Sequence, residues 1–437
     1  MLNLKSKFLA ITAALLCAGA AFAQDSGPLI DLLVKKGIIN NQEGEDLRVE
    51  LTKDFVANTS AGKLNLSSSI ADFKLSGDMR MRYEYNNQAP EIAAGGYLLS
   101  NETSRTRFRF RLNGDVTLQK GWTTGFALES GQASDSANQT FTGAADDYGV
   151  FLARAYIGWQ PSLNWAFVLG KQKNLMYTTD LRWDADINPQ GLSEVYKYFI
   201  GAKDTFEFRG MQHFIDDRTE ANNAGPLRRD TFMFENQAVY THWFAPSNLS
   251  SLIVALGYNK YNQSTIVTAP LGSASFAGSV RKQDYVTFAG EVNFANVNGA
   301  GTAFKLYWDS SVNTTADTRA YRVYNLNRTQ FSNGGKAWLA GIGYSYGLGK
   351  MQGDYSAKLD YRSVGITATD PNLNDSDWGF SKDNQKGFEL SLVYNVTDFA
   401  TFGIKYFDTK IIQKGMTFSL GNLDHSQELL VDLVVKF

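Results

Sequence analysis

The chain has 437 residues, with 42 Lys and Arg against 44 Asp and Glu, and a formal net charge of −2 at pH 7. It contains only 8 Pro but 39 Gly, and 13% of its residues are aromatic, which suits paired strands because Pro would remove hydrogen bonds from the ladder. The mean hydropathy of −0.27 excludes a bundle of apolar membrane helices, and no basic run indicates nucleic acid as a partner.

The N-terminus has the three parts of a secretory signal in the right order. Lys5 and Lys7 precede an apolar stretch, residues 8–16, which is much shorter than the about 20 residues that span a bilayer. Ala21-Phe22-Ala23 then has the small-x-small form of a cleavage site. The sequence therefore predicts a signal peptide over residues 1–23; a short buried helix is the alternative interpretation.

Residues that carry enzyme or metal chemistry are sparse. Cys17 is the single cysteine and lies within the predicted signal, and the three histidines are scattered, at His213, His242 and His425. We therefore expect no disulfide, metal site or cofactor, and no catalytic residue, because a nucleophile and a base must occur at one site. The acidic residues of 370–377 lack the spacing of a calcium loop, so we interpret this stretch as a solvated outer loop.

Residues 24–70 are predicted to form a periplasmic helical segment and linker. Asn40 and Glu43 have the spacing of a capping box, ahead of Leu47, Leu51 and Phe55 on one helical face. Two interpretations remain open. In the first, the helices of this segment pack on themselves or on the rim of a barrel. In the second, they serve as an oligomerisation or anchoring element.

From about residue 72 the period of the sequence changes from helical to two. In residues 73–85 the odd positions are mostly apolar, whereas the even positions carry Lys74, Ser76, Asp78, Arg80, Arg82 and Glu84. Residues 105–118 and 429–437 repeat this alternation, and the chain ends on Phe437. This pattern predicts an all-β fold for residues 71–437: a transmembrane antiparallel β-barrel with an apolar face toward lipid and a charged face toward water.

Short and long connections alternate along the barrel segment. Short turns are expected near 119–121, 161–164, 246–249, 296–301, 347–353 and 396–399, and polar stretches separate the other strands. With both ends on the short-turn side, a weak strand is needed near 193–199. The count is then about 16 strands, with 14 and 18 as open alternatives, and a barrel of this size leaves an aqueous lumen.

The densest chemical signal is a ladder of arginines on the predicted water-facing side. We expect the pore lining to contain Arg80, Arg82, Arg105, Arg107, Arg109 and Arg111, with the counter-charges Asp78, Glu84 and Asp115. The third long loop carries Asp180, Arg182, Asp184 and Asp186, and we predict that it folds inward as a constriction facing the arginines. The alternative is a solvated wall with local salt bridges and no selectivity.

The chain resembles the putative porin family of Gram-negative outer membranes. The resemblance rests on residues 32–39, 45–48, 105–111, 154–156, 170–172 and 183–191. It implies a diffusion channel without a known substrate. The arginine ladder is also similar to that of anion- and phosphate-leaning porins, and carbohydrate-selective porins are a second, weaker likeness.

We therefore expect a porin in the cell outer membrane that passes small hydrophilic solutes, with a preference for anions. The alternative is a non-transporting barrel that acts as a structural anchor or adhesin. The expected partners are outer-membrane lipid, the solutes or anions, further copies in a homotrimer, and the barrel-assembly machinery through Phe437.

Overall fold

The computed structural model describes Lys36 and residues 66–90, 101–131, 136–216, 231–245, 250–262, 283–324, 334–414 and 423–437. By its contacts the chain divides into two units, Met1–Ser68 and Ser69–Phe437. The predicted signal peptide and almost all of the predicted helical segment lie outside the described residues.

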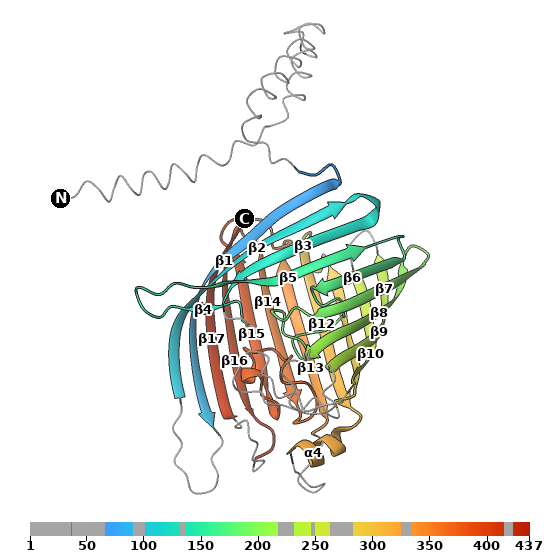
Figure 1. Ribbon diagram of the computed structural model, residues 1–437. Helices are drawn as coiled ribbons and strands as arrows, with labels where there is room; N and C mark the ends of the chain where they lie inside the picture. Colours follow the sequence, from blue (N-terminus) through green and yellow to red (C-terminus); the bar gives the residue numbers. More distant parts are fainter. Residues whose placement is uncertain are drawn as a thin grey trace, which may run out of the picture. The chain divides into compact units, whose positions relative to one another are not determined.

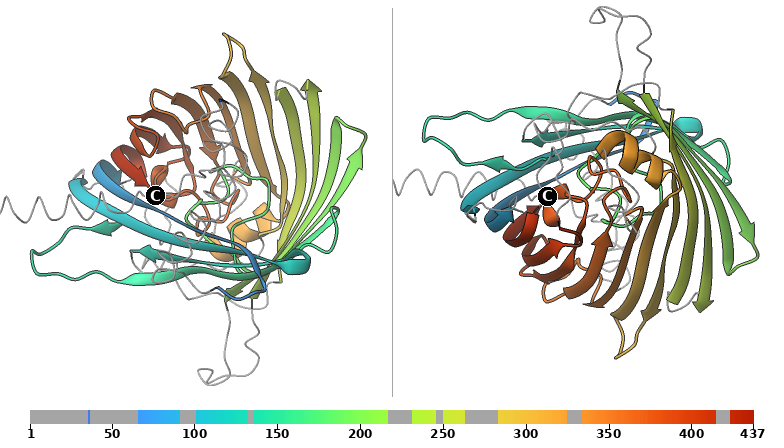
Figure 2. Two further views of the ribbon diagram at one scale, coloured as in Figure 1. Left: turned by 90° about the horizontal axis from the view of Figure 1, so that it is seen from above. Right: turned by 90° about the horizontal axis from the view of Figure 1, so that it is seen from below.

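The second unit is a closed antiparallel sheet (Figures 1 and 2). The sheet has 17 strands, of which β4 contains only two residues and pairs with β2, so 16 strands form the wall. The ring closes because β1 pairs with both β2 and β17. The strands are β1 (Ile70–Pro90), β2 (Asn101–Leu118), β3 (Trp122–Ser130), β4 (Gln139–Thr140), β5 (Val150–Trp159), β6 (Trp165–Lys171), β7 (Gln190–Ile200), β8 (Asp204–Asp216), β9 (Thr231–Ala245), β10 (Ser250–Tyr261), β11 (Tyr285–Ala295), β12 (Thr302–Asn313), β13 (Lys336–Tyr346), β14 (Tyr355–Val364), β15 (Gln385–Asn395), β16 (Ala400–Ile411) and β17 (Leu423–Lys436).

The predicted barrel of 16 strands is confirmed, and so is the weak strand, which is β7. Helical structure in the described part of the barrel is limited to α4 (Ala316–Tyr324) and the short 3-10 segments η1 (Gln119–Gly121) and η3 (Gly379–Ser381). Both ends of the wall, the start of β1 and the end of β17, lie on the side of the short turns. We call this side the short-turn end and the opposite side the long-loop end.

No helix in the described ranges is long and apolar enough to cross a membrane.

The alternation of apolar and charged residues in the sequence corresponds to the outer and inner faces of the wall. On β1, Met79, Met81 and Tyr83 are exposed on the outside, whereas Arg80 and Arg82 are buried inside the ring. A strand places successive side chains on opposite faces, so the same segment supplies both surfaces. An apolar exterior around a polar interior is the pattern of a barrel that meets lipid outside and water inside.

Two long connections fold back into the ring at the long-loop end, where Figure 2 shows chain segments inside the barrel. We call residues 172–189 the first inner loop and residues 365–384 the second inner loop. Met176 and Trp183 of the first loop share an apolar cluster with Leu373 of the second. Leu181 shares another cluster with Trp378. Full burial of such a side chain contributes about 1.5–3 kcal/mol, so these clusters hold both loops against the wall.

The interpretation of residues 370–377 as a solvated outer loop is wrong. Asp370, Leu373 and Asn374 are buried, and the Tyr261 hydroxyl donates a 2.6 Å hydrogen bond to Asp370. The polar composition of this stretch is typical of a solvated loop, but its carboxylates form hydrogen bonds and ion pairs with donors on the barrel wall. Such donors come from distant parts of the sequence, so local composition does not indicate them.

The closure of the ring predicts an effect of substitution at Gly77. Gly77 exchanges two backbone hydrogen bonds with Phe437, at 2.8 and 3.0 Å, and a Cβ atom here would overlap the carbonyl oxygen of Arg111 and the ring of Phe437. We expect Gly77→Ala to lower the free energy of unfolding by about 1–3 kcal/mol. Thermal unfolding of the purified barrel measures this. Gly343→Ala is the matched control, because the nearest atoms to its Cβ would lie 3.7 and 3.8 Å away. Equal melting temperatures for the two variants would contradict the prediction.

Candidate functional site

The predicted arginine ladder lies on the inner face of β1 and β2. The two strands pair so that Arg80 stands opposite Arg109 and Arg82 stands opposite Arg107. Asp78 is opposite Arg111 in the same register. The ladder therefore consists of charged rows that run across both strands, as the alternation of the sequence indicates.

Two acidic residues of β1 each pair with two arginines of β2. Asp78 pairs with Arg109 at 2.8 Å and with Arg111 at 2.7 Å. Glu84 pairs with Arg105 at 2.5 Å and with Arg107 at 3.1 Å. Each carboxylate lies between two guanidinium groups, and this reduces the repulsion between neighbouring cations.

The remaining arginines of the ladder have partners from other elements. Arg82 pairs with Asp432 of β17 at 2.8 Å and with Asp377 of the second inner loop at 3.4 Å. Arg80 hydrogen-bonds Asn138 and lies 3.9 Å from Asp432. The alternation of the last strand places Asp432 on the inner face, but neither Asp432 nor Asp377 was predicted as a partner of the ladder.

The ladder differs from one position to the next in its access to solvent. The side chains of Arg105 and Arg111 are 42% and 30% exposed, whereas Arg82, Arg107 and Arg109 are largely buried. Asp115, a predicted counter-charge, accepts a 3.0 Å hydrogen bond from Tyr156. The accessible positive charge is therefore concentrated at Arg105 and Arg111.

The first inner loop is tied to the opposite part of the wall by its own charges. Arg182 pairs with Asp309 of β12 at 3.0 Å and with Glu235 of β9 at 3.5 Å. Asp180 pairs with Lys358 of β14 at 3.1 Å. The ion pairs of Asp180 and Arg182 are thus with β9, β12 and β14 rather than with the arginine ladder.

Asp186 lies on the side of the first inner loop toward the arginine ladder. The backbone amide of Asp186 donates to Asp184 Oδ1 at 2.9 Å, and Asp186 acts electrostatically on Arg80. The first inner loop therefore carries charges toward both halves of the ring.

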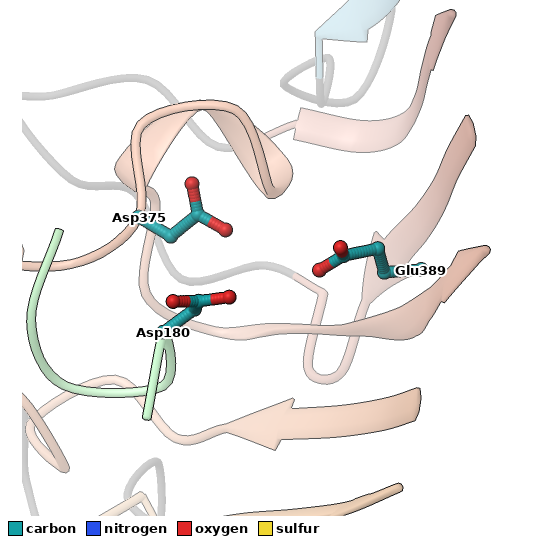
Figure 3. A group of neighbouring side chains, drawn as sticks. All are labelled: Asp180, Asp375 and Glu389. Carbon is teal, nitrogen blue, oxygen red and sulfur yellow. The ribbon is translucent and has the colours of Figure 1, made fainter. Parts of the chain in front are cut away.

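The second inner loop joins a cluster that the sequence reasoning missed. The carboxylates of Asp180, Asp375 and Glu389 point toward one another (Figure 3), with oxygen atoms within 4.8 Å. Arg362 lies among them: it bonds Asp375 at 2.8 Å and also bonds Glu389. Lys358 adds a second cation, 3.1 Å from Asp180 and from Glu389.

This cluster is an ion-pair network that ties both inner loops to β14 and β15. The Arg362 side chain is fully buried, and removing one partner of a buried pair costs about 3–5 kcal/mol. The sequence does contain a signal for this cluster. Lys358, Asp360 and Arg362 alternate along β14 and therefore occupy the same face of the strand.

The two inner loops also bind each other directly. The amide of Asp184 donates to the carbonyl of Leu373 at 2.6 Å, and the amide of Ser376 donates to Asp184 Oδ2 at 3.0 Å. Because Asp377 contacts Arg82, the loops link the cluster around Arg362 to the arginine ladder across the ring.

Open space remains beside the first inner loop. A cavity of about 370 Å³ lies against the wall, lined among others by Tyr177, Glu291, Lys305, Tyr307 and Lys358. The Tyr177 hydroxyl donates to Glu291 at 3.0 Å, and Lys305 pairs with the same carboxylate. Its lining combines aromatic rings with charges of both signs and can contact hydrated, polar molecules.

The contact between the loops predicts a dependence on pH. Burial, together with the carboxylates of Asp375 and Asp186, raises the pKa of Asp184 to about 8. The folded protein then binds more protons than the unfolded chain between about pH 4 and this pKa. The contact is therefore favoured in acid and weakens as pH rises through about 8.

Hydrogen exchange at the amide of Ser376 measures this, once it is corrected for the intrinsic exchange rate. We expect its protection to fall as pH rises in the wild type and to stay nearly constant in Asp184→Asn. Asp146→Asn, which changes a carboxylate on an exposed loop, is the control and should keep the wild-type profile. A profile that is unchanged in Asp184→Asn would assign the pH dependence to another group.

The comparisons with known proteins agree with this architecture. A family model described as putative porin matches residues 86–287. The structure of OprB from Pseudomonas putida is similar at a TM-score of 0.51 and 11% identity, over 84% of this chain and 94% of that chain. The outer membrane channel DcaP of Acinetobacter baumannii is similar at a TM-score of 0.43 and 13% identity, over 85% of this chain and 99% of that chain.

No curated protein sequence matches this chain. At 11% identity the likeness to OprB shows the fold alone. The family model covers residues 86–287, less than half of the chain, and confirms the predicted resemblance to the putative porin family.

Proposed function

We propose that this protein is an outer-membrane porin, with a water-filled lumen that lets small hydrophilic solutes cross the membrane by passive diffusion. The observation that carries the proposal is the closed wall of 16 strands with an apolar exterior and a charged interior. A barrel of this size leaves an aqueous lumen. The match to the putative porin family supports the same conclusion.

The inner loops would set the size limit of this channel. They occupy the lumen from the long-loop end and form ion pairs with β1, β9, β12 and β14. A solute would pass beside them, along the walls that keep exposed charge. The cavity near Tyr177 and Lys305 is one such space.

The proposed channel prefers anions. Arg105 and Arg111 keep exposed guanidinium groups on the inner face, and Arg stays charged at any physiological pH. Exposed cations on a pore wall attract anions and raise their local concentration. The buried arginines contribute less because carboxylates already surround them.

The proposed diffusion channel predicts stepwise conductance. The purified chain, reconstituted into a planar lipid bilayer, should insert in steps of uniform size that carry current in proportion to voltage. A non-transporting barrel that serves as an anchor or adhesin would insert without conductance. Folded barrels that insert and carry no current would overturn the proposal.

The selectivity predicts a shift in reversal potential when the accessible charge is removed. Replacing Arg105 and Arg111 with Gln should shift the reversal potential toward cations. The wild-type preference for anions should be strong at 0.01 M salt, where the screening length is about 30 Å, and weak at 1 M, where it is about 3 Å. Lys260→Gln is the control, because Lys260 is exposed on the outer face of β10.

A wild-type channel that is cation-selective in dilute salt would assign control of the pore to the carboxylates of the inner loops. An unchanged reversal potential in the double variant, with Lys260→Gln equal to wild type, would reduce the ladder to a structural role.

The proposal includes export by the signal peptide of residues 1–23. It also includes insertion of the barrel into the membrane by the barrel-assembly machinery, which recognises Phe437. It also keeps the domain boundaries at residues 23 and 70. These remain predictions from the sequence.

A further inference from the structure

Two lysines stand directly opposite each other on the outer face of the wall. Lys386 of β15 pairs with Lys410 of β16 in the register of the two strands. Lys386 shares its face of β15 with Leu390, which is exposed on the outside. Lys410 shares its face of β16 with Phe402, which is exposed in the same way. Residues in such positions have Cα atoms about 4.5–5.5 Å apart, so both ammonium groups can reach the same small region.

This lysine pair differs from the like-charged pairs inside the ring. The arginines of β1 and β2 that stand opposite each other all have a carboxylate within 3.9 Å. Neither Lys386 nor Lys410 forms a hydrogen bond or an ion pair with a residue of the described ranges. Like charges directly opposite each other in a sheet are destabilising. An anion between the two lysines would therefore stabilise this part of the wall.

A carboxylate on the same face of β16 belongs to a different set of contacts. Asp408 accepts a 3.0 Å hydrogen bond from Gln427, and its Oδ1 lies 3.2 Å from His425 Nε2. Both partners belong to β17, on the side of β16 that faces away from β15. Asp408 itself lies one row nearer to the middle of the wall, opposite Phe388. The lysine pair thus has no counter-charge of its own within the described residues.

The lysine pair lies just beyond the apolar band, at the long-loop end, where β15 begins and β16 ends. After Lys386 the outward row of β15 continues from Phe388 through Leu390 to Tyr394. Phe388 packs against Tyr406 of β16, with ring centroids 5.9 Å apart. Aromatic rings on a membrane barrel mark the interface between hydrocarbon and headgroups. The next row outward, which contains the lysines, therefore lies at the depth of the headgroups.

The charge and the depth of this pair favour a phosphate group as the missing anion. A phosphate monoester carries a charge of about −1.5 to −2 at pH 7 and offers three acceptor oxygens, so one group can neutralise both lysines. Lysine binds phosphate as a point charge. Because the apolar row of β15 begins directly beside the pair, a ligand that contacts both surfaces has acyl chains as well as a phosphate.

We propose that the outer face of β15 and β16 binds a lipid with a phosphate monoester headgroup at the long-loop end. The phosphate lies between Lys386 and Lys410, and the acyl chains lie along the apolar row of β15. The inference rests on the proposed function only in taking the barrel to cross an outer membrane. It gives a specific place on the wall to the outer-membrane lipid that the sequence predicts as a partner.

Two other lysines provide a matched control. Lys260 of β10 and Lys336 of β13 are exposed on the outer face at the same end of the wall. Each stands opposite an apolar residue, Phe234 and Val312 respectively. Lys260→Gln/Lys336→Gln therefore removes the same charge from the same rim as Lys386→Gln/Lys410→Gln, but it leaves the opposed pair intact.

Native mass spectrometry of the purified protein in nonionic detergent, titrated with dioleoyl phosphatidic acid, measures the contact. The wild type should bind this lipid more tightly than dioleoylglycerol, which lacks the phosphate. Lys386→Gln/Lys410→Gln should weaken the binding of phosphatidic acid by about 30-fold, because each lysine beside an anionic headgroup contributes a factor of about five. Lys260→Gln/Lys336→Gln should bind phosphatidic acid as the wild type does.

A charge reversal separates loss of the lipid from loss of the fold. Lys386→Glu places a carboxylate opposite Lys410, so that an ion pair can replace the contact with the phosphate. This variant should lose the lipid and melt no lower than the lipid-free wild type. Lys386→Arg/Lys410→Arg keeps both charges and should still bind the lipid.

Three results would overturn the inference. The first is an equal affinity for phosphatidic acid in the wild type and in Lys386→Gln/Lys410→Gln. The second is an equal loss of affinity in the two double Gln variants, which would show a general effect of surface charge. The third is an equal rise of the wild-type melting temperature with inorganic phosphate and with phosphatidic acid, which would assign the lysines to a free anion.

Conductance in a planar bilayer tests the porin separately. A barrel that conducts but binds no phosphatidic acid would keep the porin and reject the lipid site. A barrel that binds the lipid through the lysine pair but carries no current would reject the porin and keep the lipid site.

Discussion

A sheet that crosses lipid has to satisfy its backbone hydrogen bonds within itself, because the hydrocarbon offers no donors or acceptors. The pairing of β1 with both β2 and β17 meets this requirement. All other features follow from the closed ring. One side of every strand faces outward and has to be apolar, so nearly all of the charge in the wall is directed inward. The interior is then crowded with charges that need partners.

Charges confined to a small interior have to be paired, because an isolated buried charge costs several kcal/mol. The inner loops add partners to those that the wall supplies. Arg82 obtains one carboxylate from β17 and a second from the inner loop that carries Asp377. Lys358 is paired with Asp360 and Glu389 of the wall and obtains Asp180 from the other inner loop. These charges, together with apolar side chains that fill the space between the loops, hold the loops inside the ring.

Most of the wall could be predicted from the sequence, since strand alternation and turn spacing are local signals. The same alternation predicts that Arg80 and Arg109 share the inner face of neighbouring strands, because strands joined by one loop are neighbours in an antiparallel barrel, whereas their exact register comes from the structure. The partners of Arg82 could not be predicted, since Asp432 is 350 residues away along the chain. The inward course of residues 365–384 was missed for the same reason. Its polar composition suits solvent equally well, and its place is determined by distant partners, namely the cations of β1 and β14 and the apolar clusters around Leu373 and Trp378.

The inner loops connect parts of the ring that are far apart along its circumference. The first is bound to β9, β12 and β14, and the second is bound to β1 and β14. Loops bound to several strands across a ring limit the deformation of that ring. In the proposed channel, a cross-section connected at these points would keep its shape, and the size limit of the lumen would not depend on the tension in the surrounding membrane.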